Sequence, residues 1–273
     1  LVALGVNVSV RVTNMVNFGY ASFILWGPLA VLVLNQQFHV PLAFAFLLSL
    51  VGVLICSLLV ERVALRPFLG SGSALPWMLS TLAVGTVLER FAEYQFGGEP
   101  QPFTHNFGLS TITVLGIHTN WVEIATVLVG IVFSVLIVLY MAKTVRGRKL
   151  NAVAQDPDGA AMIGISVRRA SQEATIIVAV IAVVIGWIAA PSLQVGSSLG
   201  LTLLFTGFVA AALGGFASIT GSWVGGVLLG LVLQLGNDQL GPNYINVLLF
   251  GTLLVVYLVR PQGLFGDRTI RSV

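Results

Sequence analysis

Long apolar segments separated by short polar ones run through the whole chain. A helix that crosses a bilayer needs about 20 mostly apolar residues, within a range of about 17 to 25. Nine segments approach this length: Leu1–Val16, Phe18–Leu34, Pro41–Val60, Ala74–Phe96, Trp121–Ala142, Ser171–Ser192, Leu199–Ala217, Ser222–Gly236 and Tyr244–Val259. Membrane β-strands would instead alternate within segments of about ten residues, and this pattern is not seen. The sequence therefore predicts an all-α membrane bundle of eight or nine transmembrane helices, a single domain over residues 1–273.

The composition agrees with membrane insertion and excludes several classes of protein. Only 8% of the 273 residues are charged and 57% are apolar, whereas soluble domains carry about 25% charged residues. So few charges exclude a conventional soluble enzyme, a disordered chain and a nucleic-acid-binding surface. The single cysteine, Cys56, excludes an intrachain disulfide, and His39, His105 and His118 lack the spacing of metal ligands. Because the sequence starts at Leu1 instead of methionine, we expect natural N-terminal residues to precede it.

Lysine and arginine are concentrated in alternate connections between the predicted helices. The segments Glu61–Ser73 and Lys143–Ala170 and the tail after Val259 hold 11 of the 13 basic residues. The connections of opposite parity, among them Gly97–Asn120, contain no lysine or arginine. Basic loops of membrane proteins are retained on the cytoplasmic side. We therefore predict that these three segments, including the C-terminus, face the cytoplasm.

Glycines recur in one stretch of the C-terminal part of the chain. They are Gly214, Gly215, Gly221, Gly225, Gly226 and Gly230. Small residues four positions apart share a helix face and allow two helix backbones to approach closely in lipid. Because glycine costs about 1 kcal/mol relative to alanine in an ordinary helix, so many glycines require a geometric reason. Two interpretations are open: tight packing inside the bundle, or a subunit interface or moving element that lines a path.

The segment Thr144–Arg169 is the most polar part of the chain, yet its apolar residues keep helical spacing. Asp158 is a candidate N-cap for a short helix that runs to Ile163, because a carboxylate can accept hydrogen bonds from the free backbone N–H groups of a helix start. Gly164 would end that helix. A short amphipathic helix on the cytoplasmic side is suited to docking onto a soluble partner. A solvated connector with one helical turn is the alternative.

Four motifs, taken in order, are similar to those of one transporter family. They are Glu61-Arg62 with Arg66-Pro67; Gly147-Arg148 through Ala154-Gln155-Asp156 to Ala160–Ile165; Gly207-Phe208 with Leu213–Gly221; and Arg260–Gly266. Together they resemble the permeases of branched-chain amino acid ABC importers. The glycine-rich motif is closer to the first of the two permease types, the LivH type. The resemblance spans nearly the whole chain, with Asn17-Phe18 as a weaker match near its start.

The resemblance implies an α-helical permease with the type II ABC importer fold in the inner membrane of a bacterium. It implies a second permease, two cytoplasmic ATPases and a periplasmic binding protein as partners, and an amino acid as substrate. The chain has no GxxxxGK[ST] phosphate-binding motif. ATP and Mg²⁺ would therefore bind to the ATPase subunits, and this chain would hold no cofactor or metal. The segment 143–170 would be the loop that couples to an ATPase, through Gly147, Arg148, Lys149, Asp156, Asp158, Ala161, Met162 and Gly164.

Glu89, Arg90 and Glu93 form a charged cluster inside one predicted span. A charge at the centre of a membrane helix costs about 2.5–3.5 kcal/mol on the insertion scale, so such residues usually pair or face water. The cluster lies toward the external end of its span. It is either an interfacial cluster near the outer surface, or Glu89 and Glu93 lie at the mouth of the substrate path.

Other functions are left open by the sequence. Permeases for urea, short amides or other amino acids share the four motifs. A secondary transporter or channel is a second class, which would need a coupling-ion site or a filter within the membrane. A membrane enzyme that acts on lipid is a third class, disfavoured because no acid, base and nucleophile converge on one side. The expected protein is therefore a transport subunit and not an enzyme.

Overall fold

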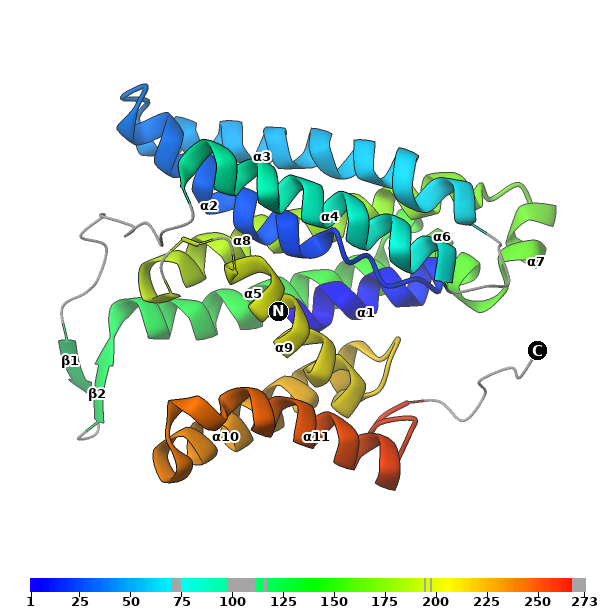
Figure 1. Cartoon of the computed structure of the whole chain (residues 1–273). Helices are drawn as coiled ribbons and strands as arrows, with labels where there is room; N and C mark the ends of the chain where they lie inside the picture. Colours follow the sequence, from blue (N-terminus) through cyan, green and yellow to red (C-terminus); the bar gives the residue numbers. More distant parts are fainter. Residues whose placement is uncertain (70–74, 98–110, 115–116, 194, 197, 267–273) are drawn as a thin grey trace.

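The computed structural model describes residues 1–69, 75–97, 111–114, 117–193, 195–196 and 198–266 (Figure 1). The helices that match the predicted spans are α1 (Val2–Thr13), α2 (Tyr20–Gln36), α3 (Leu42–Val60), α4 (Leu75–Phe96), α5 (Trp121–Lys143), α8 (Val167–Leu193), α9 (Leu199–Gly214), α10 (Ile219–Leu240) and α11 (Ile245–Val259). The other elements are the π-helical turn η1 (Glu61–Leu65), the 3-10 turns η2 (Arg66–Phe68) and η3 (Pro242–Tyr244), α6 (Val145–Gln155), α7 (Pro157–Met162), and the antiparallel strands β1 (Thr111–Val114) and β2 (Ile117–Asn120). Ala74, His105, Arg268 and Arg271 lie outside the described residues.

The predicted all-α fold is confirmed, and each predicted span corresponds to a helix of the described chain. Five helical stretches of the described residues are long and apolar enough to cross a membrane, and α1, α2 and α9 are shorter apolar helices. The number of crossing helices stays a prediction. α9 ends at Gly214, before the predicted end, because Gly215 takes a φ of 105°. The β1–β2 hairpin was not predicted, since strands of four residues give too short an alternation to be detected.

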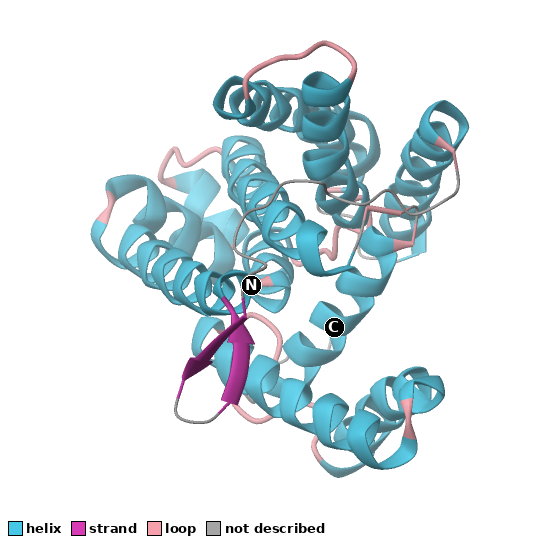
Figure 2. Ribbon diagram, turned by 90° about the vertical axis from the view of Figure 1, so that its left-hand side faces the viewer, coloured by secondary structure: helices cyan, strands magenta, loops and turns pink. Residues whose placement is uncertain are grey.

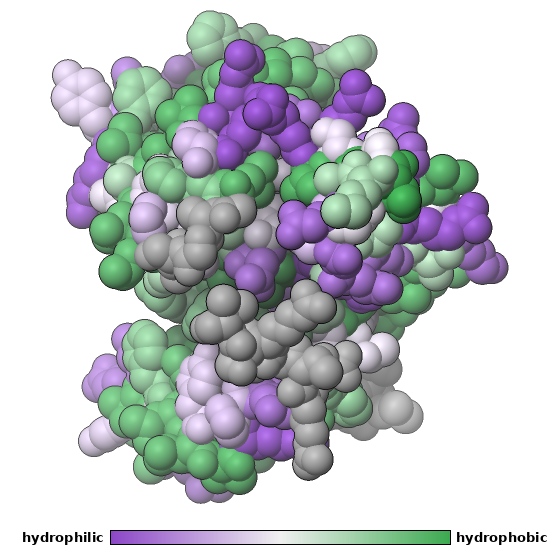
Figure 3. All heavy atoms as spheres, turned by 90° about the vertical axis from the view of Figure 1, so that its right-hand side faces the viewer, coloured by the Kyte–Doolittle hydropathy of each residue, from purple (hydrophilic) through white to green (hydrophobic). Residues whose placement is uncertain are grey.

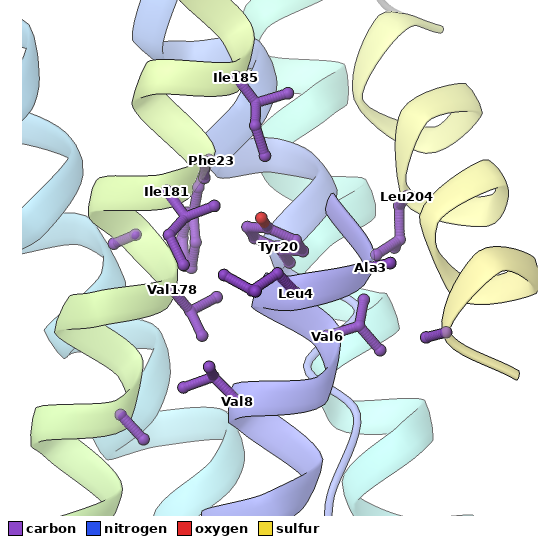
Figure 4. Packing of buried hydrophobic residues seen from close by; sticks show 14 of the residues in the cluster. Ala3, Leu4, Val6, Val8, Tyr20, Phe23, Val178, Ile181, Ile185 and Leu204 are labelled. Atoms are coloured by element: carbon purple, nitrogen blue, oxygen red, sulfur yellow. The ribbon is translucent and has the colours of Figure 1, made fainter. Parts of the chain in front are cut away.

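The centre of the bundle is formed by α1, α2 and α8, with α9 beside them (Figure 1). Their buried side chains form one cluster, in which Leu4, Tyr20, Phe23 and Ile181 lie against one another (Figure 4). Lipid tails are as apolar as these side chains, so burial alone gives little drive for helices to associate. Close van der Waals packing must therefore hold the centre together.

Glycines bring the backbones of the central helices into direct contact. A Cβ atom on Gly186 of α8 would overlap the carbonyl oxygen of Ile24 in α2. A Cβ atom on Gly200 of α9 would overlap the carbonyl oxygen of Ala21, also in α2. In both places the obstacle is backbone and not a flexible side chain. Even alanine is therefore too large at these two positions.

The outer helices α3, α4, α5, α10 and α11 expose broad apolar faces. In α4, for example, the buried residues form one narrow stripe that includes Trp77, Thr81 and Gly85. α10 and α11 lie at the edge of the bundle and reach it mainly through α9, while the β1–β2 hairpin projects from one end (Figure 2). Apolar faces of this extent are suited to lipid or to another membrane subunit.

The connections between helices gather at two opposite ends of the molecule (Figure 1). η1, η2, α6, α7 and the end of α11 lie at one end, and the α2–α3 connection, the hairpin and the α10–α11 connection lie at the other. Exposed cations at the first end include Arg62, Arg148, Lys149 and Arg169, and hydrophilic side chains are prominent in a view onto it (Figure 3). We call it the basic end. The structure thus places the basic connections together, as the sequence predicts.

The glycine-rich stretch packs α9 against α10 along one face. A Cβ atom on Gly214 would overlap the carbonyl oxygen of Gly221, and one on Gly225 would overlap the backbone of α9. Gly226 and Gly230 lie on the outer face, where an added Cβ would meet nothing within 4 Å. Tight internal packing therefore explains Gly214, Gly221 and Gly225, whereas Gly226 and Gly230 pack against no other helix in the described part of the chain.

We predict that Gly225→Ala destabilises the protein and that Gly226→Ala, one residue further along the same helix, does not. The first change forces a methyl group into the α9 backbone and should cost about 1–3 kcal/mol, as overpacking does. The second occupies open space and improves helix propensity by up to about 1 kcal/mol. Thermal unfolding of the two variants in detergent micelles measures the difference. Equal unfolding temperatures would contradict the packing described here.

Candidate functional site

The polar segment that follows α5 folds into α6 and α7 at the basic end. Thr144 caps α6, because its hydroxyl accepts a hydrogen bond from the Gly147 N–H at 2.9 Å. Gly147 is buried, and a Cβ atom there would overlap the carbonyl oxygen of Tyr140 in α5. Gly147 thus fixes the tight turn between α5 and α6. Arg148 and Lys149, which follow it, are exposed at the surface.

α6 is anchored to the bundle by its apolar face. Leu150 and Val153 are fully buried and belong to the central hydrophobic cluster, where α6 contacts α1 and α8. The Asn151 side-chain Nδ2 donates a hydrogen bond to the Met141 carbonyl at 2.9 Å. These contacts make α6 a fixed support for the segment that follows it.

Asp156 joins α6 to α7. Its carboxylate accepts a hydrogen bond from the Gly159 N–H at 3.1 Å, so it ends the first helix and caps the second. The sequence pattern predicted this cap at Asp158, and that prediction was wrong. Pro157 occupies the first helical position, which proline favours because its ring pre-sets the helical φ. Asp158 therefore lies inside the first turn of α7.

Gly164 ends this short helical segment, as predicted. Its φ is 83°, a conformation that other L-residues rarely adopt. The Ile165 N–H then donates back to the Ala160 carbonyl at 2.9 Å, and the Gly164 N–H donates to Ala161 at 3.0 Å. These are the bonds of a glycine-terminated helix end. The orientation of α7 is thereby fixed at both of its ends.

The α7 tip, residues 161–164, presents apolar side chains at the surface of the basic end. Met162 is 88% exposed and Ile163 is 74% exposed. Asp156 and Asp158 are also exposed on the same short helix, whereas Ala160 is buried and attaches it to the bundle. Two adjacent apolar side chains this exposed, with carboxylates nearby, do not belong to the core and are suited to contact with another protein.

The glycine-rich motif and the C-terminal motif, which are distant in the sequence, meet beside α1. The N–H groups of Leu264 and Phe265 in the C-terminal motif donate to the carbonyl groups of residues 213–214, each at 2.9 Å. Gly263 has a φ of 75° and lies so close to Gly215 that a Cβ atom would overlap the backbone there. The chain after α11 thus clamps the turn between α9 and α10.

Asn7, which is fully buried in α1, holds the same turn from the other side. Its Oδ1 accepts a hydrogen bond from the Ala217 N–H at 3.0 Å, and its Nδ2 donates to the Ser222 hydroxyl at 2.6 Å and the Ser218 carbonyl at 3.1 Å. Ala217 has a φ of 64°, which is uncommon for a residue other than glycine. Sequence reasoning missed Asn7. The available signal was an amide within an apolar span, where a polar group must find partners.

The charged cluster of α4 is divided between two faces of the helix. Arg90 and Glu93 form an ion pair at the surface. Glu89 is buried, and its Oε1 has no hydrogen-bond partner among the described residues. An open groove of ≈ 490 Å³ along α4 is lined by Arg90 and by apolar residues such as Leu79 and Val87. Glu89 and Glu93 are therefore not brought together. Within the described ranges, no three His, Cys, Asp or Glu side chains are grouped to hold a metal ion.

Comparison with known proteins supports the resemblance carried by the four motifs. Residues 1–258 match the family described as "Branched-chain amino acid transport system / permease component". The chain belongs to this permease family. Its apolar helices and its family make it a multi-pass membrane protein.

Relatives of this permease match along nearly their full length. The high-affinity branched-chain amino acid transport system permease protein BraD of Pseudomonas aeruginosa is 26% identical over all of this chain and 93% of its own. The corresponding protein LivH of Escherichia coli is 25% identical over all of this chain and 92% of its own. The probable LivH permease of Methanocaldococcus jannaschii is 25% identical over 97% and 88%. No solved structure matches this chain.

We predict that Asn7→Leu lowers the free energy of unfolding of this permease by about 1–3 kcal/mol, because it leaves buried backbone groups of the α9–α10 turn unpaired. Asn35→Leu is the matched control. Asn35 makes one hydrogen bond, to the Val40 carbonyl at 3.0 Å, and is only half-buried. Thermal unfolding in detergent should show a clear loss for the first variant and little for the second. A similar loss in both would argue against the clamp.

Proposed function

We propose that this permease is the membrane-spanning subunit of an ATP-driven importer of branched-chain amino acids, and that ATPase subunits drive it through the α7 tip. The printed names of its relatives support the substrate class. One observation supports the proposed coupling of the ATPase subunits to this chain. Met162 and Ile163 are exposed side by side at the basic end, at the end of a helix whose two ends are fixed.

The energy for transport comes from other chains, since this one carries no phosphate-binding motif. Two cytoplasmic ATPase subunits bind ATP and Mg²⁺, and the α7 tip docks onto one of them. Nucleotide binding shifts the permease between two states only if the ATPase makes different contacts with each state. The cap at Asp156 and the stop at Gly164 support this role, because a helix fixed at both ends moves as a unit instead of bending.

The basic end faces the cytoplasm of the bacterial cell, in accord with the usual retention of Lys and Arg on that side. The end with the β1–β2 hairpin then faces the periplasm, where a binding protein delivers the amino acid. A second permease subunit covers part of the exposed apolar surface of this chain. The substrate crosses the membrane between the two permeases.

We infer that the ion pair of Arg90 and Glu93 lies at the external mouth of that path. It offers a cation and a carboxylate to the two charged groups of a free amino acid. The groove beside Arg90 is lined mostly by apolar side chains, and such a lining is suited to branched aliphatic groups. Glu89, which the sequence also predicted at this mouth, is buried and is not among the residues that line the groove.

We expect Gly164→Pro and Asp156→Arg to abolish uptake of radiolabelled leucine while the permease stays in the membrane. Proline cannot adopt the positive φ at position 164, and arginine removes the cap and reverses the charge at position 156. Asp156→Asn keeps a capping oxygen and should retain most of the uptake. Uptake by the complete importer in proteoliposomes with ATP inside measures these effects, and excess isoleucine but not urea should compete. Full uptake by the first two variants would exclude the proposed drive.

Cysteine labelling tests the proposed orientation. In a Cys56→Ser background, Met162→Cys should react with a membrane-impermeant maleimide only in inverted vesicles. Tyr94→Cys, at the opposite end and 85% exposed in the wild-type chain, should react only in intact spheroplasts. Labelling of position 162 from the outside would reverse the assigned orientation.

A further inference from the structure

Glu61 is fully buried in η1, at the end of α3. Its Oε1 accepts a hydrogen bond from the Ser171 hydroxyl at 3.1 Å, and Ser171 is itself only 1% exposed. Its Oε2 has no hydrogen-bond partner among the described residues, nor do they contain an ion pair to this carboxylate. Ala64, Ala170 and Ala174, which flank the two residues in the sequence, are buried as well.

This arrangement does not favour stability. A buried carboxylate oxygen without a partner loses its hydration and gains nothing in return. Replacing both members of a buried polar pair by apolar groups of similar shape is often neutral or stabilising. The presence of Glu61 and Ser171 therefore requires a reason other than the stability of one packed state.

The position of the pair indicates that reason. The hydrogen bond joins segments 110 positions apart in the sequence. η1 continues α3 and contacts α4, while α8 begins shortly after the α7 tip and contacts both α7 and η1. A displacement of the α7 tip thus reaches Ser171 within the first two turns of α8. η1 is itself a π-helical turn. Such turns are rare in proteins, and those that occur are often found at functional sites.

We propose that the Glu61–Ser171 hydrogen bond is the joint through which movement of α7 passes from α8 to α3 and α4. Glu61 acts as a positioning residue, with no contact to substrate. Its second oxygen supplies an alternative acceptor, so a hydrogen bond can be exchanged and not simply lost when α8 slides along η1. This inference rests on the proposed function, because it requires α7 to be driven.

The test uses four variants of the complete importer. Glu61→Leu, Ser171→Ala and the variant that combines these two changes are each compared with the conservative variant Glu61→Gln. Leucine removes the carboxylate, whereas glutamine keeps an acceptor oxygen for Ser171. Glu61→Leu and Ser171→Ala should each lower the amount of leucine transported per ATP hydrolysed by about fivefold or more, the low end of measured allosteric coupling. The double variant should be no worse, and Glu61→Gln should keep most of the wild-type ratio. The unfolding temperature of the double variant should be unchanged or higher, because the whole buried polar pair has been removed.

Ser57→Ala is the matched control. Ser57 is fully buried in α3, and its hydroxyl donates to the Leu54 carbonyl of its own helix at 2.8 Å. This variant should leave the transport ratio unchanged. If Asp156→Arg leaves uptake intact in the same preparation, the proposed function fails. If Asp156→Arg abolishes uptake but Glu61→Leu keeps the wild-type ratio, or only lowers the unfolding temperature, the joint is overturned and the proposed function is not.

Discussion

A bilayer offers no water to an unpaired polar group, and this constraint decides how the helices of the permease meet. Apolar side chains gain little by leaving lipid for the centre of the bundle. The close contacts are therefore made by backbone against backbone, where Gly186 of α8 meets α2 and where Gly214 and Gly225 join α9 to α10. Each of these contacts depends on the missing side chain, which is why glycine is placed there at a cost in helix propensity.

The same constraint distinguishes the two buried polar contacts, that of Asn7 with the α9–α10 turn and that of Glu61 with Ser171. Asn7 uses both its oxygen and its nitrogen, and moving the α9–α10 turn away from it would leave groups on both sides unpaired. Glu61 uses one oxygen and leaves the other without a partner. Fully satisfied polar networks make a structure rigid, whereas partly satisfied ones are where it is least determined. The turn beside Asn7 is thus a fixed point, and the contact between α8 and η1 is an exchangeable one.

The sequence predicted the spans because about 20 apolar residues in a row are a local signal, and it predicted the stop at Gly164 because a left-handed helix end favours glycine. The predicted cap was two positions too late, since Asp156 and Asp158 are chemically equal candidates. Only Pro157 between them determines where the helix starts, because proline favours the first helical position. The roles of Asn7 and Glu61 could not be predicted, although an amide within an apolar span signals that Asn7 needs polar partners. Their partners lie 210 and 110 positions away, and a periodic pattern in one sequence carries no information on pairs so distant.

α8 is the element in which these features combine. It follows α7 directly, it carries Ser171 near its start, and further along Gly186 sets it against the α2 backbone. Backbone contact without intervening side chains leaves little room for sliding, so α2 would move together with α8. The contact with η1, by contrast, has one side-chain hydrogen bond as its polar link. A push on the α7 tip would therefore move α8 and α2 as one body and shear them against α3 and α4, the kind of small sliding by which packed helices change state.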